Sequence, residues 1–193
     1  MVLVLELQLR KRPAMPEQDQ PLISLTSQLS GSGYGTNAYV KSAMSYLALK
    51  DYLGDTLFKK ALHHYMDNWN GKHPIPWDYF NSMNAGSGKN LNWFWNNWFY
   101  SNYYIDLKIN SVSQNNNSVD LKVDNVGGFA IPFDVVLKFD DNSSQTKHYT
   151  PEVWEKNQKQ FLLNIPSNKK VKSVELDGGL FMDYTPDDNR KDL

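Results

Sequence analysis

The sequence contains no cysteine, which excludes disulfide bonds and thiolate metal sites and leaves the redox compartment undetermined. Only four of the 193 residues are histidines. Because glutamate follows none of them, the His-Glu-x-x-His spacing of a helical metal site does not occur. Long basic runs are absent and the net charge is -1, so we expect no nucleic-acid partner. No apolar run is long enough to cross a bilayer, so we expect no membrane partner.

The first residues do not form a recognisable signal peptide or transmembrane segment. Met1 to Leu9 is apolar but far too short to span a bilayer, and the basic cluster at 10–12 follows it, whereas in a signal peptide the basic residues come first. We interpret this stretch as an unnatural start to a truncated reading frame. The alternating leucines would equally suit an edge strand. The sequence therefore assigns no cellular location.

Hydrophobic and aromatic residues are plentiful, at 40% and 13%, so the chain can bury a core as one large domain or two small ones. Up to residue 102 the apolar positions follow helical spacing, and an irregular segment, 1–33, comes before them. We expect Thr36 or Asn37 to cap the first helix and Gly54 to end it. The predicted helices cover about 38–53, 55–69, 76–85 and 90–100.

Beyond Tyr103 the apolar period changes to two, which is typical of half-buried strands. Alternating stretches occur at 105–109, 119–123, 135–139 and 161–165, separated by turn-rich breaks. This spacing predicts a small antiparallel, immunoglobulin-like β-sandwich over 103–193, following a helical part over 34–102. The predicted fold class is α+β.

The segment Gly33 to Lys41, followed by aromatic-rich helices, resembles the second half of the catalytic domain of M1-family zinc aminopeptidases, the gluzincin class. That family has a Tyr-x-Lys-(Gly/Ser)-Ala element, which corresponds here to 39–43. The strands resemble the β-sandwich that follows in the family, through the 131–133 strand, Trp154 and the 171–177 strand. The His-Glu-x-x-His and Gly-x-Met-Glu-Asn segments of the family do not occur in this sequence.

The resemblance implies a C-terminal fragment of an aminopeptidase that removes N-terminal residues from peptides. In the full-length family zinc is the cofactor and a peptide is the substrate, whereas these 193 residues offer no metal ligands and no general base. We therefore expect the chain alone to be inactive and to need an N-terminal catalytic half as its partner. We also expect it to self-associate through the apolar surface that this half would cover, on Val40, Ala43, Met44 and Leu47. The alternative is a non-catalytic binding or interaction module.

Tyr39 is the candidate catalytic residue that the resemblance implies. In the family, a tyrosine hydroxyl at this position stabilises the oxyanion that forms when the zinc-bound water attacks the peptide carbonyl. We expect Tyr39 in the first turn of its helix, where the helix dipole favours negative charge. The alternative is a core tyrosine whose hydroxyl is satisfied locally.

Tyr34 and Gly35 are the candidate substrate-binding residues, because a glycine-rich loop at 31–37 would let the backbone approach a ligand closely. A flexible connector is an equal alternative. We predict no metal site, since His63 and His64 are adjacent on a helix and point apart. The aromatic stretch 93–100 is interpreted as core and interdomain contact, and the aspartates at 177–188 as a solvated acidic tail.

Overall fold

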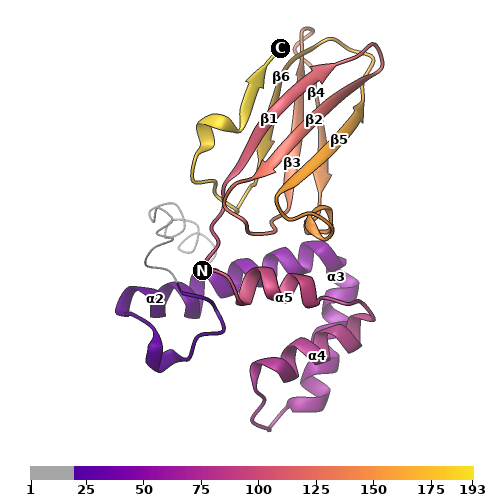
Figure 1. The fold of residues 1–193 in the computed structure, drawn as a ribbon. Helices are drawn as coiled ribbons and strands as arrows, with labels where there is room; N and C mark the ends of the chain where they lie inside the picture. The colour runs from indigo at the N-terminus through magenta and orange to yellow at the C-terminus, as the bar shows by residue number, and fades with distance from the viewer. Residues whose placement is uncertain (1–19) are drawn as a thin grey trace. The chain divides into compact units, whose positions relative to one another are not determined.

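The computed structural model describes residues 20–193, which form two compact units divided between Asn102 and Tyr103 (Figure 1). One unit is helical and the other is built from strands. The stretch Met1 to Leu9, for which an edge strand was one interpretation, lies outside the described residues. Within residues 20–193, no helix has the length and apolar character that a membrane crossing requires.

The helical unit contains one short 3-10 turn and a succession of helical segments. In chain order these are η1 (Thr26–Gln28), α2 (Gly31–Gly35), the π-helical turn η2 (Thr36–Lys41), α3 (Ser42–Trp69), α4 (Pro76–Ser87) and α5 (Asn92–Phe99). Helices α3 and α4 pack against each other.

Helix α3 is bent at Gly54, where φ is 72° and ψ is 159°. Glycine adopts this left-handed backbone without the steric cost that a β-carbon would impose. The sequence predicts two helices that meet at Gly54, and the kink lies at that residue. Just after it, Oδ1 of Asp55 lies 2.9 Å from Nζ of Lys50, so an ion pair spans the bend.

The start of the first helix differs from the prediction. Helical structure begins at Gly31 and not near Ala38, and Thr36 and Asn37 are buried within a π-helical turn and do not cap an N-terminus. The cause is tertiary, because the side-chain nitrogen of Asn37 donates to the carbonyl oxygens of Gln20 and Pro21 at 3.0 and 3.1 Å. These bonds turn the side chain toward a distant segment, and its Oδ1, the atom with which a cap accepts a backbone N–H, is buried without a partner among residues 20–193.

Helix α4 extends past Gly86, where the sequence predicts its end, and stops at Gly88, which has a φ of 69°. Gly86 is required for packing. A β-carbon built on it would lie 2.7 Å from Cα of Ala61 and 2.8 Å from Cβ of His64, both in α3. The absence of a side chain at Gly86 therefore lets the two helices approach closely.

Aromatic side chains form the core of the helical unit. The Phe80 and Trp95 rings are stacked at 4.8 Å, and Phe94 and Trp98 are fully buried. The indole nitrogen of Trp95 donates to Oδ1 of Asn84 at 3.0 Å, which ties α5 to α4. The predicted role of the 93–100 stretch as core is confirmed for its buried members.

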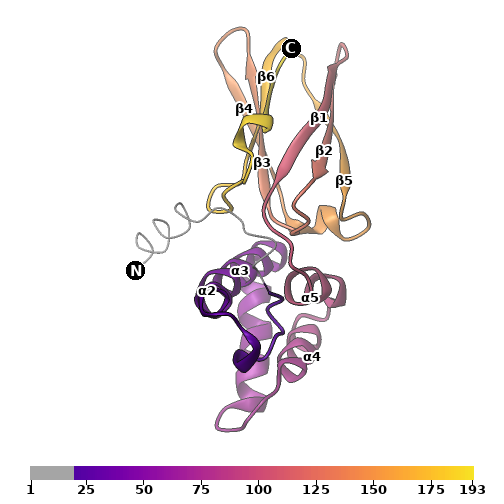
Figure 2. The same cartoon turned by 60° about the vertical axis from the view of Figure 1, so that its left-hand side comes forward.

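The strand unit contains two antiparallel sheets, which Figure 2 shows as two layers. One sheet has the order β1-β2-β5 and the other β4-β3-β6-β7. The strands are β1 (Leu107–Gln114), β2 (Ser118–Asn125), β3 (Phe133–Phe139), β4 (Ser144–Tyr149), β5 (Gln160–Pro166), β6 (Val171–Asp177) and β7 (Arg190–Asp192). The stretches that alternate in the sequence fall on β1, β2, β3 and β5, except that 105 and 106 come before β1, and the predicted α+β class is confirmed.

Trp154 lies at the centre of the strand unit and has no exposed surface. Its ring lies 5.7 Å from that of Phe133 in β3 and 6.2 Å from that of Phe161 in β5, so it contacts both sheets. Its indole nitrogen donates to the carbonyl oxygen of Ile131 at 2.9 Å. Burial of a large ring together with a satisfied N–H makes Trp154 the main link between the two layers.

Candidate functional site

Tyr39 lies in the π-helical turn η2 between two anchored neighbours. The side chains of Asn37 and Lys41 both donate to the carbonyl oxygen of Gln20, at 3.0 and 2.9 Å. Both residues are buried. Because residues three to four positions apart share one face of a helical turn, Tyr39 between them faces the opposite side.

The side chain of Tyr39 is 65% exposed, and no hydrogen bond of its hydroxyl occurs among residues 20–193. The prediction that Tyr39 lies in the first turn of its helix is wrong, since helical structure begins eight residues earlier at Gly31. The helix dipole therefore contributes little at this position, because its effect is confined to the first turn. What remains is an exposed O–H donor on a helical turn that the bonds of Asn37 and Lys41 anchor to Gln20.

Tyr34 and Gly35 belong to helix α2, so the prediction of a glycine-rich loop at 31–37 is wrong. Tyr34 is exposed, and a β-carbon on Gly35 would meet nothing within 4 Å. The space beside Gly35 is therefore open, although its backbone is helical. Tyr34, Gly35 and Tyr39 lie within six residues of one another on consecutive turns.

A face that is at least partly exposed continues from Tyr39 along α3. Ala43 is half-buried, and Tyr46 and Leu47 are exposed. These residues, 39, 43, 46 and 47, recur at helical spacing and form what we call the exposed stripe. Met44, which the sequence predicts on an exposed apolar surface, is buried within the unit at 3% exposure, so that part of the prediction is wrong.

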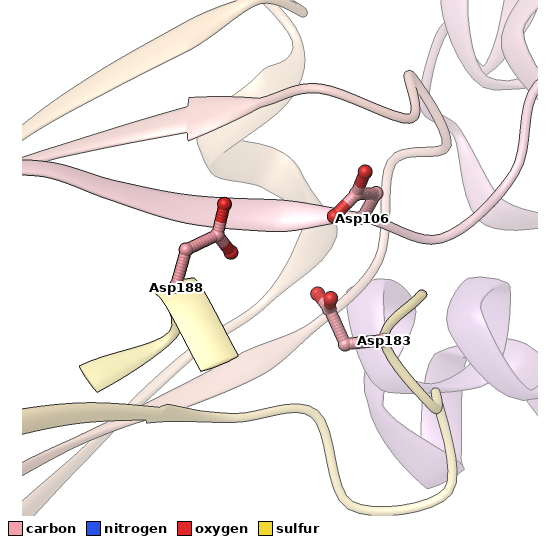
Figure 3. A group of neighbouring side chains, drawn as sticks. All are labelled: Asp106, Asp183 and Asp188. Carbon is pink, nitrogen blue, oxygen red and sulfur yellow. The ribbon is translucent and has the colours of Figure 1, made fainter. Parts of the chain in front are cut away.

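No histidine belongs to a group of possible metal ligands among residues 20–193. His63 and His64 are exposed neighbours on α3, and Nδ1 of His148 lies 2.6 Å from Oδ1 of Asp134 in β3. Among residues 20–193, the side chains close enough together to share an ion are three aspartates of the strand unit, Asp106, Asp183 and Asp188. Figure 3 shows their carboxylates pointing toward one another.

The three aspartates come from two distant parts of the chain. Asp106 lies just before β1, whereas Asp183 and Asp188 belong to the segment between β6 and β7. Asp183 is held by two backbone donors, the N–H of Leu107 at 2.7 Å and the N–H of Thr185 at 2.8 Å. We call this group the aspartate cluster. Its ligand oxygens all lie within 4.8 Å of one another.

Asp106 is the most deeply buried member of the cluster, at 5% exposure. Burial, followed by the neighbouring negative charge of Asp183 and then of Asp188, raises the pKa of Asp106 to about 6. The backbone around it is closely packed, since its carbonyl oxygen accepts the N–H groups of Val126 and Gly127 at 2.8 and 2.9 Å. A buried carboxyl with like charges beside it is an unfavourable arrangement unless a proton or a cation compensates it.

Sequence reasoning missed the cluster. It placed Asp106 on the polar face of an alternating strand and the later aspartates in a solvated tail. The strand begins at Leu107, however, so Asp106 lies outside the alternating part and turns inward. The one signal in the sequence is the density of aspartates between 177 and 188, which does not by itself identify the partner at 106.

Residues 13–98 match the model of the Peptidase family M1 domain. No curated protein matches the chain. Among solved structures, Legionella pneumophila aminopeptidase A, in a crystal structure with aspartic acid, is similar with a TM-score of 0.58 at 21% identity. This similarity establishes a shared fold. It covers 75% of this chain but only 17% of that one, so the chain spans about a sixth of the solved protein.

Proposed function

We propose that the chain is a C-terminal segment of a zinc-dependent aminopeptidase, a proposal supported by the match of residues 13–98 to the M1 peptidase domain. The parent enzyme would remove N-terminal residues from peptides. The observation that carries the proposal is the placement of Tyr39, exposed on a rigid helical turn within the segment that matches the family.

Tyr39 would donate its hydroxyl hydrogen to the carbonyl oxygen of the substrate as that oxygen becomes an oxyanion. Such a donor accelerates the reaction because the charge that it stabilises develops only in the transition state. The bonds of Asn37 and Lys41 to the carbonyl of Gln20 hold the turn in place, so little ordering is required during the reaction. In this proposal Lys41 positions Tyr39 and does not touch the substrate.

Zinc in the parent family would activate the attacking water. The residues of the described chain do not fit a zinc site, because their one candidate ligand group is made only of carboxylates and contains no histidine. Zinc in proteins is held mainly by histidine and cysteine with carboxylates in support. The metal, the water and the general base would therefore come from a segment with His-Glu-x-x-His, and 20–193 would supply the oxyanion donor.

The exposed stripe is the surface on which that segment would pack. Tyr39 and Ala43 lead into Tyr46 and Leu47 at helical spacing, and apolar side chains on one helix face favour burial against a partner. Tyr34 and Gly35 would line the adjoining substrate cleft. The same stripe would cause these 193 residues to self-associate when expressed alone.

A chimera tests the proposal. A family segment that contains His-Glu-x-x-His is joined ahead of residue 13, and hydrolysis of amino-acid anilides is measured. Tyr39→Phe should lower kcat by about 10²–10³ with little change in KM, since one transition-state donor is lost and the ring is kept. Tyr100→Phe, at another exposed tyrosine of the helical unit, should retain full activity.

Two results would contradict the proposal. Near-normal turnover by the Tyr39→Phe chimera would show that the residue is structural. A chimera that folds and binds zinc but has no activity with Tyr39 intact would favour the non-catalytic interaction module. Circular dichroism and metal analysis of each variant distinguish these results from misfolding.

A further inference from the structure

We propose that Asp106, Asp183 and Asp188 form a binding site for a hard divalent cation, Ca²⁺, in the strand unit. This site is independent of the proposed peptidase function, since all three residues lie outside the segment that matches the peptidase family. Its role would be structural, because it would join the segment before β1 to the segment between β6 and β7.

The geometry of the aspartate cluster suits one ion. Oxygens bound at about 2.4 Å to a common Ca²⁺ lie no more than about 4.8 Å apart. One oxygen from each of the three carboxylates meets that condition. Figure 3 shows the carboxylates of Asp188 and Asp183 directed from the C-terminal segment toward Asp106 on the adjoining strand end. Such convergence of three acids is costly without a positive charge among them.

The second observation is an unpartnered oxygen. Oδ1 of Asp106 is buried and has no hydrogen-bond partner among residues 20–193, and the whole residue is only 5% exposed to solvent. Oδ1 of Asp188 is also buried without a partner in this part of the chain. A buried carboxylate oxygen that lacks a donor loses its hydration and gains nothing in return. A cation bound among these carboxylates would supply a positive partner for them.

Among residues 20–193, the ion pair at the cluster is that of Lys108 with Asp188, on one oxygen of a single carboxylate. Nζ of Lys108 lies 3.6 Å from Oδ2 of Asp188, which leaves Oδ1 of the same carboxylate unpartnered in the described chain. Asp183 already accepts two backbone N–H groups, and these fix its orientation while leaving a further lone pair on each oxygen. The cluster is thus ordered in advance of binding.

The chemistry of the ligands selects the class of ion. Carboxylates without histidine or thiolate favour hard cations over zinc or copper. Ca²⁺ accepts six to eight oxygens in irregular geometry, which suits three side chains from two separate segments together with water, whereas Mg²⁺ requires a near-ideal octahedron. The alternative is an acid pair in which Asp106 and Asp183 share a proton and no metal binds.

The test is Ca²⁺ binding to the full chain after treatment with a chelator, at pH 7.5. We expect a Kd of about 10⁻⁴–10⁻³ M, as in sites with few protein ligands, and a rise in the Tm of the strand unit of roughly 5 °C or more at 10 mM Ca²⁺. Tb³⁺ should bind competitively and emit on tyrosine excitation, because Tyr104 interacts with Asp106.

The variants are Asp106→Asn and Asp188→Asn, with Asp187→Asn as the control. Asp187 is exposed and lies in the same 3-10 turn as Asp188, and its substitution by Asn changes the net charge by the same amount. Each cluster variant should lose at least about tenfold in Ca²⁺ affinity, and the control should match the parent chain. Asp106→Asn should also raise the Tm of the metal-free protein, because it removes a buried charge that lies beside two like charges. The raised Tm would also show that the variant folds.

Three results would overturn the proposal. The first is no binding heat and no Tm shift of the parent chain up to 10 mM Ca²⁺. The second is an equal Ca²⁺ response in Asp106→Asn and the parent, which would place any binding elsewhere on the acidic surface. The third is a higher metal-free Tm of Asp106→Asn with no Ca²⁺ effect on either protein, which would identify the cluster as a proton-sharing acid pair.

Discussion

Gly86→Ala should destabilise the helical unit even though alanine is the better helix former. Gly86 lies in α4 against Ala61 and His64 of α3, and its new β-carbon would lie within 3 Å of two α3 atoms. One of them is a Cα and the other a Cβ, so no side-chain rotation relieves the contact. The helices must instead separate.

The magnitude follows from two opposing effects. Overpacking of a close contact costs about 1–3 kcal/mol, and replacing glycine by alanine inside a helix contributes about 1 kcal/mol of stability. The overpacking prevails, because the clash involves backbone and a β-carbon. We therefore expect a net loss of up to about 2 kcal/mol for Gly86→Ala, with no rescue by His64→Ala, which keeps the clashing β-carbon.

Urea unfolding followed by tryptophan fluorescence measures this change, because five of the six tryptophans lie between residues 69 and 98. Gly31→Ala is the matched control. A β-carbon at that helical glycine would meet nothing within 4 Å, so its substitution should be neutral or slightly stabilising. A Gly86→Ala protein at least as stable as the parent would refute the argument that close helix approach requires this glycine.

Two further predictions concern a buried link and a surface charge. Trp154→Ala should lower the free energy of unfolding by about 3–5 kcal/mol, because it leaves a cavity and removes the donor to the carbonyl of Ile131. Calorimetry of the strand unit measures this change, and a loss under about 1 kcal/mol would contradict the linking role of Trp154. Hydrogen bonding to Lys50 lowers the pKa of Asp55, so Lys50→Gln should raise that pKa in an NMR titration. A lowered carboxyl pKa stabilises the fold above the unfolded pKa, and this contribution is lost as the pH falls. The difference in stability between Lys50→Gln and the parent should therefore vanish in acid. An unchanged pKa of Asp55 in Lys50→Gln would exclude Lys50 as its main partner.

The sequence predicted most of the architecture because local periodicity and burial agree over long stretches. In the strand unit, each alternating segment places its apolar residues inward, as in β2, where Val119, Leu121 and Val123 are all buried. The bend at Gly54 was also predictable, since a glycine between two amphipathic patterns ends the helical spacing. Such features depend on neighbours in sequence.

The misplaced features depend on contacts with distant segments. Asn37 is a residue type that often caps helices. Here, however, its side-chain nitrogen donates to the carbonyls of Gln20 and Pro21, and helical structure begins earlier, at Gly31. Gly86 is a residue type that often ends helices, but here its lack of a side chain allows close packing against Ala61. In both cases a residue type suited to a local role is used for a tertiary one, which a single sequence does not reveal.

The distinction between local patterns and distant contacts also separates Tyr39, which the sequence identifies, from the aspartate cluster, which it does not. Tyr39 belongs to a short contiguous element, 39–43, so a pattern of neighbours could identify it, and only its helical context was wrong. Asp106 gains its properties from Asp183 and Asp188, more than seventy residues away, and from lying one position before β1. A carboxylate on an outward position of a strand would be solvated, whereas the same carboxylate one residue before the strand is buried among like charges. The chemistry of Asp106 is therefore set by where its strand begins, and that boundary is fixed by pairing with β2 and not by the local alternation.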